Sequence, residues 1–195
     1  MLRNTLQLAA LTIRRPGDGV RIVIRLLGDS VRMQVESLVL VAIVGTLLMV
    51  AMDRLGPGAA GPGTMLLTTA PLFLTIIQVA AMALIAALMF GVGRVFGGRG
   101  GFSDCLSTVI WLQAILMLFQ IAQLVTWFVL PFLSFLVTMA ALMAAAYLFI
   151  SFIKEVHGFR NVFAVIIGVI VTLFVVAGML AMLLSVVGFQ QQAPI

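Results

Sequence analysis

The longest stretch without a formal charge sets the strongest limit on what this chain can fold into. The 49 residues from Cys105 to Ile153 contain no Asp, Glu, Lys or Arg. A single helix of that length would overshoot a bilayer about twofold, because each residue adds about 1.5 Å. Two spans joined by a tight turn fit the length. Trp127 and Pro131 mark that turn, since tryptophan prefers the membrane interface and proline disfavours helix in the residue before it.

The rest of the composition extends this argument to the whole chain. Apolar residues make up 64% of the 195 residues and charged residues only 9%, with a mean hydropathy of +1.29. A soluble domain carries roughly 25% charged residues, so these values indicate an integral membrane protein. We therefore expect an all-α polytopic bundle of five transmembrane helices within residues 37–188, with spans at about 37–52, 65–93, 105–127, 130–153 and 161–187.

The basic residues predict the orientation of these spans. With five spans and an internal N-terminus, the outer side holds only Arg54 and the inner side holds ten basic residues, namely Arg3, Arg14, Arg15, Arg21, Arg25, Arg32, Arg94, Arg99, Lys154 and Arg160. This asymmetry follows the positive-inside rule. We expect a cytoplasmic N-terminus and an external tail, 189–195.

The net charge of +5 has two interpretations: binding to nucleic acid, or contact with the membrane surface. The charges lie on short segments next to the predicted spans, so anionic lipid headgroups explain them and no nucleic-acid partner is expected. The side chains expected to contact headgroups are Arg21, Arg25, Arg94 and Arg99.

Residues 1–36 form the predicted cytoplasmic N-terminal segment. From Val20 to Ser37 the charged residues recur every three or four positions, which predicts one amphipathic helix at the membrane surface or against the bundle. Its stripe consists of Arg21, Arg25, Asp29, Arg32 and Glu36. Two i,i+4 ion pairs are expected along it, Arg25 with Asp29 and Arg32 with Glu36. Its role is either to set the topology or to bind a partner. The preceding "RRPGDG" is expected to be a turn.

The segment "FGGRGGF", Phe96–Phe102, joins the second and third predicted spans on the cytoplasmic side. Its glycines permit a sharp turn with positive φ angles, and Ser103 or Asp104 can cap the next helix. The nucleotide-binding patterns fail here, because the spacing is wrong and no Gly-Lys-Ser/Thr is present. We expect a structural, lipid-facing loop.

Few residues could carry catalysis or bind a metal. The single cysteine, Cys105, precedes an apolar run and is expected to be a buried thiol, and the single histidine, His157, is expected in a wet cytoplasmic turn. Neither has an evident partner for a metal site or a nucleophile–base pair. We predict no catalytic residue, cofactor or metal.

Two groups of residues within the spans predict contacts between helices. The first consists of glutamines, which should hydrogen-bond other helices or line a polar pathway: Gln78, Gln113, Gln120 and Gln123. The second is a small-residue face that permits close packing: Ala140, Ala141, Ala144 and Ala145.

Three motifs carry a resemblance to a known family: an N-terminal "RRP", the loop "FGGRGGFSDCLSTVIWLQ" and "VHGFRN" before the last span. Together with the five predicted spans, they resemble the bacterial branch of the Yip family, membrane proteins named for interaction with Ypt/Rab GTPases. The resemblance implies a non-enzymatic protein of the bacterial cytoplasmic (inner) membrane. It supplies no catalytic residues.

The function that these features predict is interaction with proteins or lipids, as a membrane organiser, a homo-oligomer or an accessory subunit of a membrane complex. The alternative is a small transporter or channel component, favoured by the glutamines. An enzyme acting on lipid would depend on Asp104 and His157 and is the weakest of the three hypotheses.

Overall fold

The computed structural model describes residues 2–28, 30–55 and 70–186, and this part of the chain is helical with no strand. Its seven helices are α1 (Leu2–Arg14), α2 (Pro16–Leu27), α3 (Val31–Leu55), α5 (Pro71–Val95), α6 (Phe102–Val129), α7 (Pro131–His157) and α8 (Val162–Val186). The all-helical prediction is confirmed. The predicted tail 189–195 and the start of the predicted span 65–93 lie outside the described residues.

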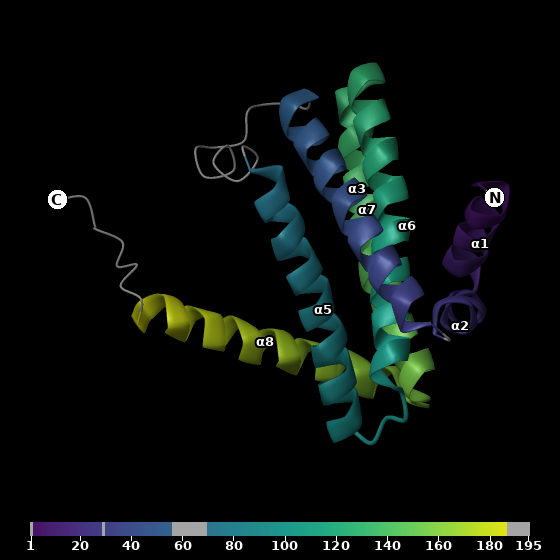
Figure 1. Cartoon of the computed structure of the whole chain (residues 1–195), viewed down its shortest axis with the longest axis vertical. Coiled ribbons are helices and arrows are strands. Elements are labelled where there is room, and N and C mark those ends of the chain that lie inside the picture. Colours follow the sequence, from purple (N-terminus) through teal and green to yellow (C-terminus); the bar gives the residue numbers. More distant parts are fainter. Residues whose placement is uncertain (1, 29, 56–69, 187–195) are drawn as a thin grey trace.

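Four of these helices are long and apolar enough to cross a membrane: α3, α5, α6 and α7. Each has 25 to 28 residues, or about 38–42 Å, against a hydrocarbon core of about 30 Å. In α8 the apolar stretch among the described residues, Val165–Gly178, is shorter. Figure 1 shows α8 leaving the bundle at a steep angle to α5, whereas the other four helices run in similar directions.

The turn inside the charge-free stretch is confirmed. Helix α6 ends at Val129 and α7 begins at Pro131, with the extended residue Leu130 between them. Proline suits this first position, where its missing N–H has no helical partner to lose. The two helices form an antiparallel hairpin.

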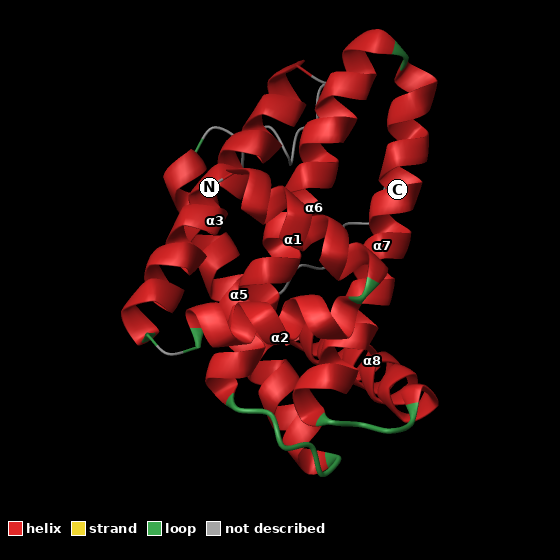
Figure 2. Ribbon diagram, turned by 90° about the vertical axis from the view of Figure 1, so that its right-hand side faces the viewer, coloured by secondary structure: helices red, strands yellow, loops and turns green. Residues whose placement is uncertain are grey.

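Helix α6 is the centre of the bundle and contributes to both clusters of buried residues. The first cluster joins it to α3 and α5 through Leu38, Met82, Ala86, Met89, Cys105, Leu106, Val109 and Ile110. The second joins it to α1, α2 and α7 through Ala9, Val20, Val23, Trp111, Ile115, Leu148 and Phe152. Figure 2 shows α1 and α2 lying in front of α6 and α7. Cys105 is fully buried, as expected.

The N-terminal segment differs from the sequence expectation. The helix expected over Val20–Ser37 is divided, because α2 ends at Leu27 and α3 begins at Val31. Ser30 explains the new start, since its hydroxyl accepts a hydrogen bond from the Met33 amide (3.4 Å). The first 36 residues are therefore not separate from the membrane domain, because α3 continues from Val31 into the span.

The charged stripe is correspondingly split between two helices. Arg32 and Glu36 form the expected i,i+4 ion pair at 2.7 Å. The other expected pair, between Arg25 and Asp29, lies partly outside the described residues. The expected turn "RRPGDG" is also wrong beyond Arg15, because α2 begins at Pro16.

A buried hydrogen bond fastens α1 to the central helix. The indole Nε1–H of Trp111 donates to the Thr12 hydroxyl (3.1 Å), and that hydroxyl donates to the Leu8 carbonyl (2.7 Å). Both side chains are buried, at 8% and 0% exposure. A larger residue does not fit at Gly19 of α2, because a methyl group there would overlap Thr12.

We predict that Trp111→Phe will loosen α1, because it removes the bond to Thr12 and part of the buried ring. The free energy of unfolding should fall by about 1–3 kcal/mol. Hydrogen exchange of the α1 amides in detergent-solubilised protein measures the effect directly. Trp127→Phe, which makes the same change near the other end of α6, is the control. Equal protection of α1 in the two variants would contradict this role.

Candidate functional site at the glycine-loop end

The single histidine lies at the point where the ends of α5 and α7 and the start of α6 meet. His157 is the last residue of α7 and is 2% exposed. The expectation of a wet turn was wrong for this residue. Its Nε2 lies 3.0 Å from the carbonyl oxygen of Met89 in α5 and 3.9 Å from the sulfur of Cys105 in α6.

Glycines make this close approach possible. A methyl group on Gly93 would overlap the imidazole ring, and one on Gly98 would lie 2.5 Å from Nδ1. One on Gly100 would lie 2.6 Å from Val156 and 3.0 Å from Nδ1. We call these three glycines and His157 the histidine socket. The glycine-rich sequence is thus explained by packing against α7.

The same glycines end the helices. At the end of α5, the Gly97 and Gly98 amides donate to the Arg94 (3.0 Å) and Gly93 (2.7 Å) carbonyls, and Gly97 has a φ of +80°. This is a Schellman motif, which satisfies carbonyls that a helix end leaves unpaired. The expected positive φ is confirmed at this glycine.

A second Schellman motif ends α7. The Gly158 amide donates to the Glu155 carbonyl (3.3 Å) and the Phe159 amide to the Lys154 carbonyl (3.0 Å), with a φ of +69° at Gly158. The two motifs are joined, because the Arg99 amide donates to the carbonyl of His157 (3.3 Å). The loop after α5 therefore also caps α7.

The start of α6 completes the socket. The Asp104 carboxylate accepts a hydrogen bond from the Gly101 amide (3.0 Å), as one of the two expected caps, and its charge suits the positive end of the helix dipole. The other candidate, Ser103, has a different role. Its hydroxyl accepts from the buried amide of Gln34 (2.6 Å), which also donates to the Ser107 hydroxyl (2.8 Å).

The hydrogen bonds of the socket define the tautomer of His157. A carbonyl oxygen only accepts, so Nε2 carries the proton that is donated to Met89. Nδ1 is buried without a hydrogen-bond partner among the described residues. A second proton there would leave a buried N–H unpaired, so the imidazole is neutral.

The four glutamines predicted to contact other helices differ in their hydrogen bonds. Gln78 accepts a hydrogen bond from Thr46 in α3 (3.0 Å), and Gln123 donates to Thr138 in α7 (2.7 Å). Gln113 is half-buried, and the Oε1 atom of Gln120 is buried without a partner among the described residues. Sequence reasoning missed Gln34, because it was assigned to the N-terminal segment.

The alanines and arginines of the predicted sites differ in their exposure to solvent. Ala140 is exposed, whereas Ala141, Ala144 and Ala145 are half-buried. The four arginines expected at headgroups are exposed: Arg21, Arg25, Arg94 and Arg99. Arg21 forms an ion pair with Glu155 of α7, and the Arg94 guanidinium lies 5.5 Å from the centre of the Phe90 ring.

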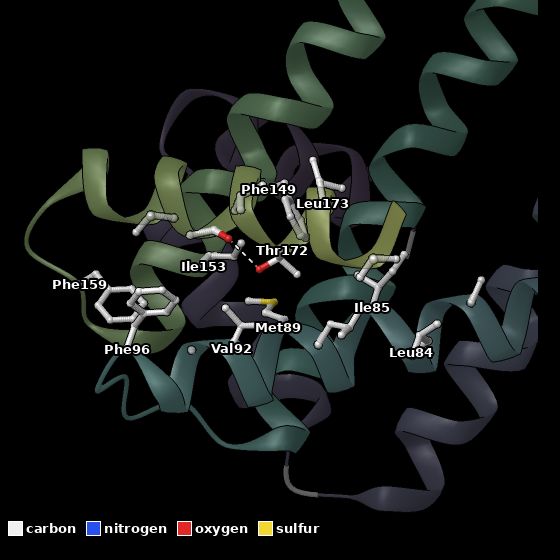
Figure 3. Close-up of a pocket in the computed structure, with 17 residues that line it drawn as sticks. Leu84, Ile85, Met89, Val92, Phe96, Phe149, Ile153, Phe159, Thr172 and Leu173 are labelled. Carbon is white, nitrogen blue, oxygen red and sulfur yellow. Dashed lines mark hydrogen bonds between the residues drawn. The ribbon is translucent and has the colours of Figure 1, made fainter. Parts of the chain in front are cut away.

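An apolar groove of about 360 Å³ lies between α5, α7 and α8, next to the socket. Figure 3 shows Met89 and Ile85 on one side and Thr172 and Leu173 on the other, with Phe96 and Phe159 at one end. The hydroxyl of Thr172 donates to the Gly168 carbonyl of its own helix (2.7 Å). The groove therefore presents a surface without a free polar donor to an occupant.

Within the described part of the chain, no group of three or more His, Cys, Asp or Glu side chains could hold a metal ion. The groups gathered at the socket are used to end and join helices. Together with the four long apolar helices, this arrangement defines an all-helical membrane protein in which polar side chains such as Gln34, Gln78 and Gln123 join neighbouring helices.

Comparison with protein families identifies this class more closely. Residues 12–185 match the Yip1 domain, so the chain belongs to the Yip1 domain family. The resemblance carried by the loop and the "VHGFRN" segment is confirmed at the level of the family. A search of curated proteins and one of solved structures gave no significant match.

We predict that Gly93→Ala will destabilise the protein by about 1–3 kcal/mol, because the added methyl group overlaps His157 in a close-packed site. Thermal unfolding in detergent measures the change. Gly91→Ala is the matched control, since a methyl group two residues earlier in α5 meets nothing within 4 Å. It should be neutral or slightly stabilising. Equal melting temperatures for both variants would rule out the socket as a packing constraint.

Proposed function

We propose that this chain is a non-enzymatic integral membrane protein that acts by contacting other membrane proteins and anionic lipids. The observation that carries this proposal is the use of the polar side chains between helices. Gln34, Gln78 and Gln123 each bond a neighbouring helix, so they serve as internal contacts rather than as a polar pathway. Outward, the described part of the bundle presents large apolar side chains and, at the glycine-loop end, exposed arginines such as Arg94 and Arg99.

The histidine socket supports a non-enzymatic role. A general base needs a ring nitrogen that reaches the proton of a substrate or nucleophile. The ring of His157 is buried, and its Nε2 proton is donated to the Met89 carbonyl. The thiol of Cys105, whose sulfur lies 3.9 Å from this Nε2, is fully buried as well.

We further propose the complete topology: five spans with α8 as the fifth, a cytoplasmic N-terminus and an external C-terminus, in a bacterial cytoplasmic membrane. The basic asymmetry supports this orientation, and α8 has 25 residues without a charge. A helix that is apolar on every side belongs in hydrocarbon or in a protein core.

Reporter fusions test this topology. A periplasm-active reporter joined after Ile195 and one inserted near Gly61 should both be active, and one inserted near Gly98 should be inactive. The reason is that five crossings place the ends on opposite sides. A cytoplasmic signal at Ile195 with an external signal near Gly61 would leave four spans and remove α8 from the count.

The outward face of α7 supports association with another membrane helix. Ala141 and Ala145 lie one heptad before the buried residues Leu148 and Phe152, so this pair faces the bundle. Ala140 lies one heptad before Tyr147, which is 52% exposed. We infer that Ala140 allows a helix of a second copy, or of a larger complex, to approach closely.

We predict that Ala140→Phe will weaken this association by about tenfold or more, since a ring there separates the two helices. Light scattering of the purified protein reports self-association, and copurification from the native membrane under mild detergent reports other partners. Ala145→Phe is the internal control and should lower the melting temperature instead. A wild-type protein that is monomeric and copurifies with no other protein would refute the proposed function.

A further inference from the structure

We propose that the groove between α5, α7 and α8 holds one acyl chain of an anionic glycerophospholipid, with its phosphate at the end marked by Arg99 and Arg160. This inference rests on the proposed function and names the lipid and its site. Its support comes from the lining of the groove, its length and the charges at one end.

The lining selects an apolar occupant. All residues of the groove other than Thr172 are hydrophobic or glycine, and the Thr172 hydroxyl is already bonded within α8, as the dashed line in Figure 3 marks. Water does not fill an apolar cavity that offers it no polar partners. A volume of about 360 Å³ is within the range of ligand pockets, roughly 300–1,000 Å³. In a membrane the available occupant is a hydrocarbon chain.

The length of the groove fits a chain rather than a compact molecule. Along α5 its lining extends from Ala81 to Phe96. At about 1.5 Å per residue this is about 22 Å, whereas one leaflet contributes about 15 Å of hydrocarbon. An extended acyl chain that enters at the loop end therefore meets groove residues of α5 over the depth of its leaflet.

The charges at the loop end suit a phosphate. Arg160 directly follows Phe159, which lines the groove, and Arg99 follows Phe96 by three residues. Both arginines are exposed, and neither forms an ion pair with another described residue. Two of the acidic residues at this end are engaged, since Asp104 bonds the Gly101 amide and Glu155 pairs with Arg21.

This local excess of positive charge favours an anionic headgroup over a zwitterionic one. Each basic residue at the membrane surface changes the affinity for anionic lipid about fivefold. The apolar groove and the basic end then recognise the two halves of one molecule, an acyl chain and a phosphate.

Lipid retention tests the proposal. The full chain is reconstituted in vesicles of equal parts phosphatidylglycerol and phosphatidylcholine with the same acyl chains, extracted in detergent, and examined by native mass spectrometry. The wild-type protein should retain one phospholipid per chain, with phosphatidylglycerol in excess. Gly168→Leu should lower retention about tenfold, the effect of displacing two methylene groups. Its added Cβ meets only Phe96, at 3.7 Å, so the change fills the groove.

Matched variants separate this effect from damage to the fold. Gly178→Leu makes the same change in α8 at a position where a methyl group meets nothing within 4 Å, and it should retain the lipid. If Gly168→Leu loses its helicity, Ile85→Trp fills the groove from α5. Its control is Ile77→Trp, because the two isoleucines are similarly exposed, at 41% and 43%, and only Ile85 lines the groove.

The assignment of the phosphate to Arg99 and Arg160 is tested by a separate measurement. Arg99→Gln and Arg160→Gln should each reduce the ratio of retained phosphatidylglycerol to phosphatidylcholine about fivefold. Arg54→Gln is the control. Arg54 lies in the last turn of α3, at the end away from the glycine loop, so its replacement should leave the ratio unchanged. Equal retention of both lipids by the wild-type protein would overturn the phosphate assignment.

Two outcomes would overturn the acyl-chain assignment. One is retention that Gly168→Leu and Ile85→Trp leave unchanged. The other is a lipid-free wild-type dimer that either variant dissociates, which would assign the groove to a second copy. In both cases unchanged copurification of partner proteins would leave the proposed function standing, so the two failures are distinguishable.

Discussion

The pairing of backbone groups at helix ends is the constraint on which this structure depends most. An unpaired carbonyl or amide costs several kcal/mol where water is absent. At the glycine loop, three helix ends meet and satisfy one another: Gly97 and Gly98 cap α5, the Arg99 amide caps α7, and Asp104 caps α6. This arrangement requires left-handed backbone at Gly97 and close contact between loop and helix. These capping and packing roles explain why the loop is rich in glycine, and the explanation needs no bound ligand.

The neutral imidazole of His157 occupies the space that these glycines leave and joins α7 to α5 through the Met89 carbonyl. The first residues of α3 are attached to the same end, because Gln34 bonds Ser103 and Ser107. Helices α1 and α2 are held by Trp111 and by the ion pair between Arg21 and Glu155. The cytoplasmic end predicted from the sequence is therefore one packed unit rather than a set of surface loops.

The sequence predicts the features that depend on local hydrophobicity and on single residues with strong backbone preferences. The hairpin within the charge-free stretch and its turn at Pro131 are of this kind, as is the Asp104 cap. Ser30, which caps the start of α3, lies within the regular charge spacing from Arg21 to Glu36 that predicts one continuous helix. The two helices keep a similar spacing of charges across the break, so periodicity alone cannot reveal it.

The socket could not be predicted in the same way, because it depends on which helices are neighbours. His157 in a short polar segment is normally exposed, and the approach of Gly93 from α5 and of Gly98 from the loop after it buries the ring. Similarly, Gln34 belongs to the bundle only because α3 begins three residues earlier and brings it beside Ser107. The arrangement of polar groups thus follows from tertiary packing, whereas the presence of long apolar helices follows from the local sequence.

The direction of α8 connects the capped end of α7 to the groove. Gly158 ends α7 in the left-handed conformation, and the Asn161 side chain accepts a hydrogen bond from the Phe163 amide (2.9 Å) at the start of α8. These two local caps define the turn through which α8 leaves the bundle. Because α8 supplies one wall of the groove and α5 the opposite wall, the angle between the two helices determines its width. A molecule in the groove has contacts with both walls, so its binding and the angle of α8 are thermodynamically coupled.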